Sequence, residues 1–175
     1  MESNKFKAVL GILRLSMGLD FLWAFADKVW GLGFSTCRDT ATNVVTTMCD
    51  SAWLSGGSPT TGFLKFGVIG PFADFFHSLA GVAAVDWLFM LGLLFIGLTL
   101  TLGIATKLGA YAGALMLFLM YLAVGIQPEH HPFIDDHFVY FFVMLAVAWS
   151  ESGKYWGFGN AWAGTSFVQK YPILK

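Results

Sequence analysis

Charged residues are scarce in this sequence. Lys, Arg, Asp and Glu make up 12% of its 175 residues, with a formal net charge of −1, whereas soluble domains carry about 25% charged residues. The few positive charges form no basic run, so the sequence has no footprint for nucleic acid. A P-loop, a dinucleotide fingerprint and a nucleophile elbow are also missing. These absences exclude a nucleic-acid-binding protein and leave no motif of a nucleotide-dependent enzyme or a serine hydrolase.

Apolar residues dominate instead. Hydrophobic side chains make up 57% of the chain, and the mean hydropathy is +0.67. A helix needs about 20 mostly apolar residues to cross the hydrocarbon core of a bilayer. Four segments approach this length, at about 8–31, 83–105, 108–126 and 133–150. We therefore predict an all-α integral membrane protein, a four-transmembrane-helix bundle formed by a single domain that covers residues 1–175.

A long segment separates the first two predicted spans. Residues 33–82 form the predicted outer loop, whose first part is rich in Ser, Thr, Gly and Asp. Its second part, 62–79, is aromatic and short and contains Pro71, so it suits an interfacial or re-entrant helix better than a span. We therefore expect one extra short interfacial helix in this loop.

Positive charge predicts the orientation of the chain in the membrane. An even number of spans places both termini on one side. Seven of the ten Lys and Arg residues fall on that side: Lys5, Lys7, Arg14, Lys107, Lys154, Lys170 and Lys175. By the positive-inside rule, we predict a multi-pass protein of the cell membrane with both termini cytoplasmic and a cytoplasmic tail at 153–175.

Both cysteines lie in the predicted outer loop. In an oxidising compartment, Cys37 and Cys49 are able to form a disulfide that closes this loop. Two unpaired thiols are the alternative.

Small residues recur along the second and third predicted spans. Gly109 and Gly113 form a small-x-x-x-small face, and Gly92 and Gly97 place two further residues without side chains on the preceding span. Such faces let membrane helices approach closely. We interpret these glycines as packing features.

The first predicted span carries four ionisable residues, Arg14, Asp20, Asp27 and Lys28. An ionisable side chain at the centre of a membrane helix costs at least about 2.5–3.5 kcal/mol and usually faces the protein interior. We therefore predict that these four, with Asp135, line a polar interior or bind substrate. The alternative for Arg14 and Lys28 is that their long side chains snorkel to opposite interfaces. Asp20, nearer the middle of the span, fits this alternative less well.

A second polar group lies near the predicted outer face. Under the predicted topology all four histidines reach this depth, together with Asp86 and with Asp135 and Asp136 at the start of the fourth span. Histidine and carboxylate groups suit proton transfer to or from a membrane quinone, which takes up protons when it is reduced. We predict that Asp86, Asp136 and His137 are catalytic. For Asp86, a first-turn carboxylate that stabilises its helix is the alternative.

Two adjacent histidines, His130 and His131, are weak candidates for metal ligands. Adjacent positions in a loop are poor support for a metal site, and the sequence has no H-x-x-x-H or C-x-x-C spacing. We therefore predict no metal and no haem, and quinone as a substrate.

Several segments together resemble the DoxX/DoxD family of small four-helix membrane proteins. The resemblance covers about residues 8–150 and is carried mainly by 14–18 (RLSMG), 57–64 (GSPTTGFL), 85–90 (VDWLFM) and 132–137 (PFIDDH). The family element at the fourth helix is similar to N-P-F-x-D-x-H, and His131 stands here in place of the asparagine. The family's DoxD member is the large subunit of a thiosulfate:quinone oxidoreductase. The resemblance therefore implies a quinone-linked redox role, with thiosulfate as candidate electron donor and a small partner subunit.

Two functions stay open at this point. The first is a quinone-linked membrane redox subunit that resembles thiosulfate:quinone oxidoreductase. The second is a non-catalytic accessory or assembly subunit of a larger respiratory or other membrane complex, because the chain has no recognisable redox centre apart from the cysteine pair. In both cases we expect contacts with membrane lipid and with a partner subunit or a second copy of the chain.

Overall fold

The computed structural model describes residues 4–124 and 131–174 of this all-helical protein. The long helices are α1 (Asn4–Trp30), α3 (Ala83–Leu102), α4 (Thr106–Val124) and α5 (Asp136–Trp149), and the short ones are α2 (Ala73–Ser78), α6 (Gly159–Ala163) and α7 (Ser166–Lys170). Single helical turns lie at Trp53–Ser55, Phe63–Gly67, Ser152–Lys154 and Pro172–Leu174. Within the described residues the only β-type pairing is one isolated bridge between Arg38 and Val45. The predicted all-α fold class is confirmed.

Three helices, α1, α3 and α4, are long and apolar enough to cross a membrane. Helix α5 is apolar as well but has only 14 residues. At a rise of 1.5 Å per residue it is about 21 Å long, shorter than the hydrocarbon core of roughly 30 Å. These helices indicate a membrane protein.

The start of α5 differs from the predicted span at 133–150. Asp135 has an extended backbone, and its side chain accepts a hydrogen bond from the backbone N–H of Phe138 at 2.8 Å. This is the geometry of an N-cap, which ends the extended chain and starts the helix at the next residue. The helix therefore begins at Asp136, three residues after the predicted start of the span.

The turn between α3 and α4 also differs from the prediction. Helix α3 ends at Leu102, three residues before the predicted limit, because Gly103 takes a left-handed conformation with φ 73° and its N–H bonds back to the carbonyl of Thr99. Glycine adopts this conformation at helix ends without steric cost. Helix α4 then begins at Thr106, two residues earlier than predicted, and the two helices form a tight antiparallel hairpin.

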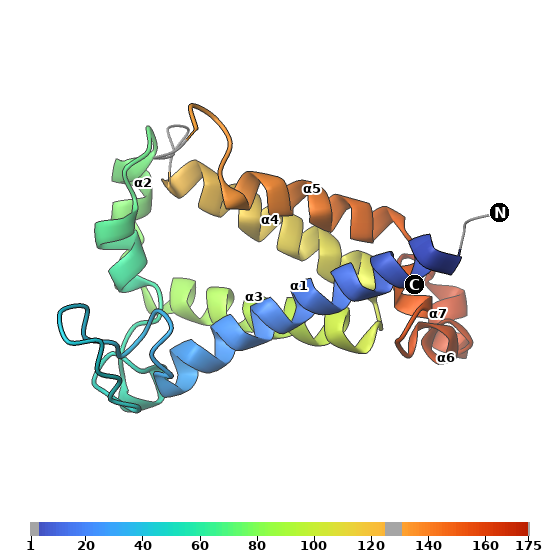
Figure 1. The fold of residues 1–175 in the computed structure, drawn as a ribbon, viewed down its shortest axis with the longest axis horizontal. Helices are drawn as coiled ribbons and strands as arrows, with labels where there is room; N and C mark the ends of the chain where they lie inside the picture. The colour runs from blue at the N-terminus through green and yellow to red at the C-terminus, as the bar shows by residue number, and fades with distance from the viewer. Residues whose placement is uncertain (1–3, 125–130, 175) are drawn as a thin grey trace.

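The long helices form two antiparallel pairs. Helix α1 packs on α3, α4 packs on α5, and α3 joins the pairs by packing on α4. Figure 1 shows the pairs converging where α1 starts and where α6 and α7 lie, and spreading apart toward α2. We call the first of these the terminal end of the molecule and the second the loop end.

The core is apolar and is closed by small residues. Buried side chains from all four long helices form one cluster, which includes Met17, Phe21, Leu93, Ile96, Leu117 and Met144. Glycines make the close approaches, since a Cβ on Gly18 would lie 2.7 Å from the backbone nitrogen of Thr101, and one on Gly113 would lie 1.9 Å from Met144 Cε. The glycines of the second and third spans thus lie in helix packing, as the sequence predicts.

A second, smaller apolar cluster lies at the loop end. It joins α2 and the turn before it to the last residues of α4 through Leu64, Val68, Phe76 and Ala123. The backbone N–H of Gly70 also donates to the carbonyl of Ala123 at 3.4 Å. Helix α2 therefore falls within the segment where a short extra helix was predicted, and it packs against the bundle.

The loop after α1 is held by a disulfide between Cys37 and Cys49. It folds back against the end of α1, where the backbone N–H of Met48 donates to the carbonyl of Trp30 at 2.8 Å. Gly31 has a φ of 66°, and a Cβ there would lie 2.2 Å from the sulfur of Cys37. Only glycine permits both this conformation and this approach.

Asp39 shapes the exposed tip of the same loop. Its carboxylate accepts hydrogen bonds from the backbone N–H groups of Thr42 and Ala41, and these bonds lower the pKa of Asp39. Because the pKa is lowered on folding, the turn is favoured above the ordinary pKa of aspartate and loses this contribution as the pH falls.

Candidate functional site

The structure divides the polar residues of the loop end into separate groups. Asp27 and Asp86 each bind a loop segment, whereas Asp135 binds the first turn of its own helix. Among the described residues no hydrogen bond or ion pair joins Asp86 to Asp136 or His137. Asp86 therefore has no hydrogen bond or ion pair to the other two residues predicted as catalytic, which are neighbours in the sequence.

Asp27 and Lys28 hold the start of the outer loop. The buried carboxylate of Asp27 accepts from the backbone N–H of Phe34 at 2.8 Å and from both the N–H and the hydroxyl of Ser35 at 3.0 and 2.9 Å. Lys28 Nζ donates to the same Ser35 hydroxyl at 3.1 Å. Both oxygens of Asp27 are thus occupied by protein donors, and this pair organises the chain after α1.

Asp86, in the first turn of α3, anchors a different part of the loop. It is buried, and its Oδ1 accepts from Ser58 Oγ at 2.9 Å, from Thr60 Oγ1 at 2.5 Å and from Thr60 N at 3.3 Å. These donors lie more than 20 residues earlier in the chain. Asp86 therefore combines a first-turn position on its helix with a bond network that fixes the segment around Pro59.

Asp135 and His137 form the one histidine–carboxylate pair at the loop end, as far as the described ranges extend. His137 Nδ1 lies 2.7 Å from Asp135 Oδ2, while Asp135 Oδ1 caps α5. Both side chains are partly exposed. The next residue, Phe138, packs its ring against that of Tyr121 at 5.3 Å between centroids. This pair has the geometry of an imidazole oriented by a carboxylate, with its other nitrogen free of protein hydrogen bonds in the described residues.

The remaining polar residues of this cluster do not form a metal site in the part of the chain that is described. His131 Nδ1 accepts hydrogen bonds from the backbone N–H groups of Phe133 and Ile134 at 3.1 and 3.0 Å, and Asp136 is exposed. His130 lies outside the described residues. Within residues 4–124 and 131–174 no three His, Cys, Asp or Glu side chains are grouped so as to hold a metal ion.

Arg14 is fully buried, but at the terminal end and without a carboxylate partner in the described residues. A guanidinium has five N–H bonds to donate. They reach five backbone carbonyls, those of Leu100, Thr101, Ser152, Tyr155 and Trp156. The burial of Arg14 agrees with the prediction that it lies in a polar interior. Its donors tie α1 to the end of α3 and to the chain after α5, and substrate binding by Arg14 stays a prediction.

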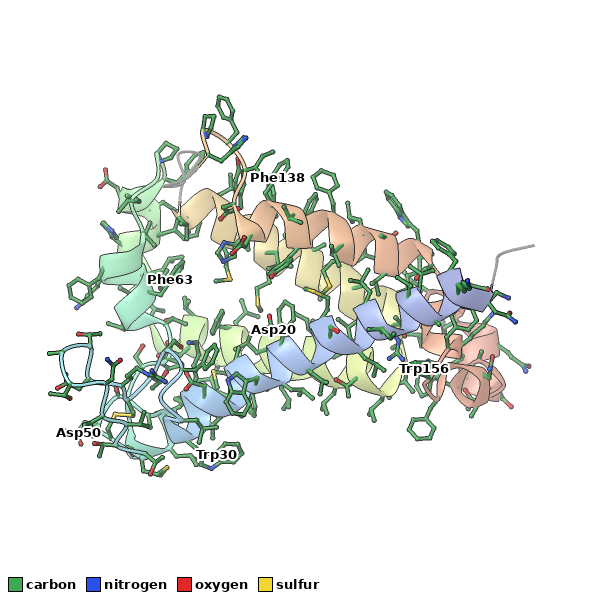
Figure 2. The ribbon with its side chains drawn as sticks, viewed as in Figure 1. Asp20, Trp30, Asp50, Phe63, Phe138 and Trp156 are labelled. Atoms are coloured by element: carbon green, nitrogen blue, oxygen red, sulfur yellow. A yellow bond between two sulfur atoms is a disulfide. The ribbon has the colours of Figure 1, made fainter. Side chains whose placement is uncertain are left out.

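The exposure of Asp20 contradicts the prediction that its side chain faces the interior. It is exposed on α1, about midway along the helix (Figure 2). The buried stripe of α1 instead runs through Met17, Gly18 and Phe21 and packs on α3. Helix α3 covers α1 more than any other long helix does in the described structure, and on the side that bears Asp20 the side chains of Leu19 and Trp23 are exposed as well. No hydrogen bond or ion pair to Asp20 is present among the described residues.

Sequence reasoning missed the hydroxyl groups that bind the carboxylates. Ser35 completes the bonds of Asp27, and Ser58 and Thr60 complete those of Asp86. The available signal was the segment 57–61, in which hydroxyl residues flank a proline. Such a segment is typical of a turn that bonds a nearby acid, but nothing in the sequence indicates which acid.

No known protein family model, no curated protein and no solved structure matches this chain. The resemblance to the DoxX/DoxD family therefore stays a prediction that depends on the sequence segments given above.

Proposed function

We propose that this chain is a non-catalytic membrane subunit that packs through α1 against a helix of a partner membrane protein. The proposal depends on Asp20, an exposed carboxylate midway along a membrane helix. Its neighbours on the same side are apolar, with Leu19 56% and Trp23 48% exposed. Ser16, one turn away, is the other polar residue on this side.

Lipid is a poor occupant for this face. A carboxylate in the hydrocarbon core costs at least about 2.5–3.5 kcal/mol, even when the bilayer adapts to it. A partner helix with a Lys, Arg or hydroxyl donor removes that cost, and Ser16 and Asp20 together offer it two hydrogen-bonding groups. The occupant we propose is therefore a membrane helix that carries a basic or hydroxyl side chain opposite Asp20.

The other predicted polar residues support a scaffold role. Arg14, Asp27 and Asp86 are buried, and each is bound by protein groups that hold loops or helix ends in place. These three residues thus offer a substrate few free hydrogen-bonding groups. The bonds stiffen the bundle, and a stiff bundle presents the α1 face in a defined orientation.

In the bilayer, we propose four spans with both termini cytoplasmic. Helix α5 lies along α4 and returns the chain to the terminal end, although its 14 residues need the flanking chain to complete the crossing. The exposed lysines Lys5, Lys107, Lys154 and Lys170 favour a cytoplasmic terminal end. The disulfide loop then lies in the oxidising compartment, and α2 lies near the outer interface.

Site-specific photo-cross-linking tests the partner face. A benzophenone amino acid at Leu19, in membranes of the native host, should give one adduct of defined mass, while the same group at exposed Leu98 of α3 should not. Asp20→Leu should weaken the Leu19 adduct at least about tenfold, given the cost of leaving the partner's polar group unpaired. An Ile12→Leu control on the same side should keep it.

Three other outcomes are informative. An adduct of twice 19.2 kDa assigns the face to a second copy of the chain. Adducts of equal strength from Leu19 and Leu98 contradict a specific partner face. Labelling of lipid alone at Leu19 also contradicts it.

A quinone-linked redox subunit is the second candidate function, and the Asp135–His137 pair favours it. The pair lies at the loop end, next in sequence to Phe138, whose ring packs against that of Tyr121. An imidazole held by a carboxylate is able to exchange a proton with a quinone at its free nitrogen. The residues of this pair belong to the segment that resembles the DoxX/DoxD family element, which supplies thiosulfate as the candidate electron donor.

Reduction of a water-soluble quinone by thiosulfate tests this candidate. In protein purified with its native lipid and partners, His137→Ala should lower the turnover number by about 10²–10⁴-fold, the usual contribution of a proton-transfer group. His77→Ala, another exposed histidine at the loop end, is the matched control and should keep full activity. Full activity of His137→Ala removes the pair from any mechanism.

A further inference from the structure

The terminal end contains a pocket of about 240 Å³ between the start of α4 and the chain that follows α5. Its lining includes Thr106, Lys107, Trp149, Glu151 and Lys154. The volume is below the roughly 300–1,000 Å³ of sites for drug-sized ligands. It suits a small group, such as a single anion or the headgroup of a lipid.

Two lysines, one glutamate and the start of a helix line the pocket. Helix α4 begins at Thr106, and the first N–H groups of a helix have no partner within it and attract anions. Lys107 has no ion pair in the described residues, and Lys154 Nζ contacts Glu151 Oε1 at 2.7 Å. The Glu151 side chain is 67% exposed, and an exposed ion pair of this kind is weak. An incoming anion is therefore able to replace Glu151 as the partner of Lys154.

A buried hydroxyl supplies an independent reason to expect a ligand. Thr106 is 6% exposed, and its Oγ1 is buried without a hydrogen-bond partner in the described structure. Buried hydroxyls normally have a partner, because an unpaired one loses its bonds to water and gains none. Gly153 also lines the pocket and packs closely on this hydroxyl, since a Cβ there would lie 2.5 Å from Thr106 Oγ1.

We propose that this pocket binds the phosphate group of an anionic membrane lipid. Lys107, Lys154 and the start of α4 would neutralise the phosphate, and the Thr106 hydroxyl would donate to one of its oxygens. The pocket lies where the apolar helix α3 ends and the apolar helix α4 begins. The ends of membrane-spanning helices lie at the depth of the lipid headgroups. Trp149 lines it and is exposed, with its indole N–H donated to the hydroxyl of Tyr111 at 3.1 Å, as is typical of an aromatic side chain at the membrane interface. This proposal does not depend on the partner face of α1.

Thermal unfolding of the purified full chain in a neutral detergent provides the test, with phosphatidylglycerol, phosphatidylcholine or inorganic phosphate added. Phosphatidylglycerol should raise the unfolding midpoint of the wild type by several degrees more than phosphatidylcholine does. Lys107→Gln and Thr106→Val should each remove most of that difference. Lys170→Gln, an exposed lysine of α7 outside the pocket, should keep it.

Native mass spectrometry of the same samples should show one retained phosphatidylglycerol per chain, reduced at least about tenfold in Lys107→Gln. If inorganic phosphate stabilises the wild type as much as phosphatidylglycerol does, and Lys107→Gln removes both effects, the phosphate site stands but its ligand is a soluble anion. Equal stabilisation by the two lipids would overturn the proposal. The proposal would also be overturned if Lys170→Gln removed the stabilisation by phosphatidylglycerol and Lys107→Gln did not. General surface charge would then explain the effect.

Discussion

At the scale of single residues, Arg14 is a buried cation whose charge is balanced by dipoles. Five backbone carbonyls surround its guanidinium, and these carbonyls come from the end of α3 and from the chain after α5. Carbonyls at the end of a helix have no partner within it and carry a partial negative charge. Arg14 therefore satisfies backbone groups that have no water to bind, and it joins three segments that are far apart in sequence.

Replacement of Arg14 by lysine tests this role. Lysine has three N–H bonds on one nitrogen and cannot reach carbonyls spread around a planar guanidinium. At least two carbonyls should lose their partner, at about 1–3 kcal/mol each, so we expect Arg14→Lys to lower the free energy of unfolding by about 2–6 kcal/mol. SDS titration followed by tryptophan fluorescence measures this change. Lys5→Gln, at an exposed position of the same helix, should have almost no effect, and a stability of Arg14→Lys equal to the wild type would contradict the assignment.

Substitution of Asp86 separates an anchoring role from a catalytic one. Asn keeps an oxygen that accepts from Ser58 and Thr60 but loses the charge, which makes such bonds roughly twice as strong. Ala removes the acceptor and leaves buried donors unpaired, at about 1–3 kcal/mol each. We expect Asp86→Ala to destabilise the protein clearly more than Asp86→Asn in the same titration. A loss of quinone reduction in Asp86→Asn without any loss of stability would instead identify a catalytic carboxylate.

At the scale of elements, α1 and α3 approach each other through glycines on both helices. A Cβ on Gly18 would meet Thr101 Oγ1 at 2.6 Å and Thr101 N at 2.7 Å, and one on Gly97 would meet the Leu22 side chain at 2.7 Å. Membrane helices gain their association energy from such close packing rather than from the hydrophobic effect. The position of α1 therefore depends on the absence of side chains at two residues.

Two alanine substitutions compare backbone and side-chain contacts. In Gly18→Ala the new methyl group meets backbone, so α1 has to move away from α3, and we expect a loss of about 1–3 kcal/mol. In Gly92→Ala it meets only the terminal methyl of Met116, at 2.6 Å, and this flexible side chain is able to shift. Gly92→Ala should therefore unfold near the wild-type midpoint and Gly18→Ala well below it. Equal midpoints for the two variants would show that α1 does not depend on close contact with α3.

The disulfide loop should open independently of the bundle. A cross-link that closes a loop of this length contributes about 3 kcal/mol in the chain-entropy model, and here it constrains mainly the segment between Cys37 and Cys49. In a Cys37→Ser, Cys49→Ser double variant we expect trypsin to cleave after Arg38 about 100-fold faster, since cleavage follows the population of the open loop. The midpoint of bundle unfolding should stay unchanged. A large fall in that midpoint would show that the loop is part of the folding unit.

At the scale of the whole molecule, both helix pairs return to the terminal end, where Arg14 and a group of glycines close the bundle (Figure 1). Gly103, Gly153 and Gly159 pack so tightly there that a Cβ on either of the last two would lie under 3 Å from the Gly103 carbonyl oxygen. The loop end is held differently, by α2 and by carboxylate bonds to loops. The arrangement predicts that α1 begins and α5 ends on the same side of a membrane.

Cysteine accessibility tests this topology. In the disulfide-free variant, single cysteines at Lys5 and Lys170 should react with an impermeant maleimide only after the cytoplasmic face is exposed, and one at Ser55 should react from outside. If the cysteines at positions 5 and 170 were labelled from opposite sides, α5 would not cross the membrane and three helices would span it. Labelling of all three positions from outside would reverse the orientation derived from positive charge.

The amino-acid sequence alone predicts the membrane class, the all-α fold and the approximate limits of the long helices. These properties depend on the length and polarity of segments, which local composition determines. It also indicates that Arg14, Asp27 and Asp86 require partners, because an ionisable group has no favourable place in lipid. The sequence does not indicate that these partners are backbone carbonyls, backbone N–H groups and hydroxyls 7 to 142 residues away.

Only the tertiary structure decided which side of each helix is covered. Asp20 and Gly18 lie two residues apart on α1, and the rotation of the helix against α3 buries the glycine and exposes the carboxylate. That rotation follows from the fit of Gly18 and Gly97 against the facing helix, a property of two surfaces in contact. Composition and periodicity describe one helix at a time, so the sequence determined that α1 carries charge, and helix packing decided that Arg14 is buried and that Asp20 faces outward.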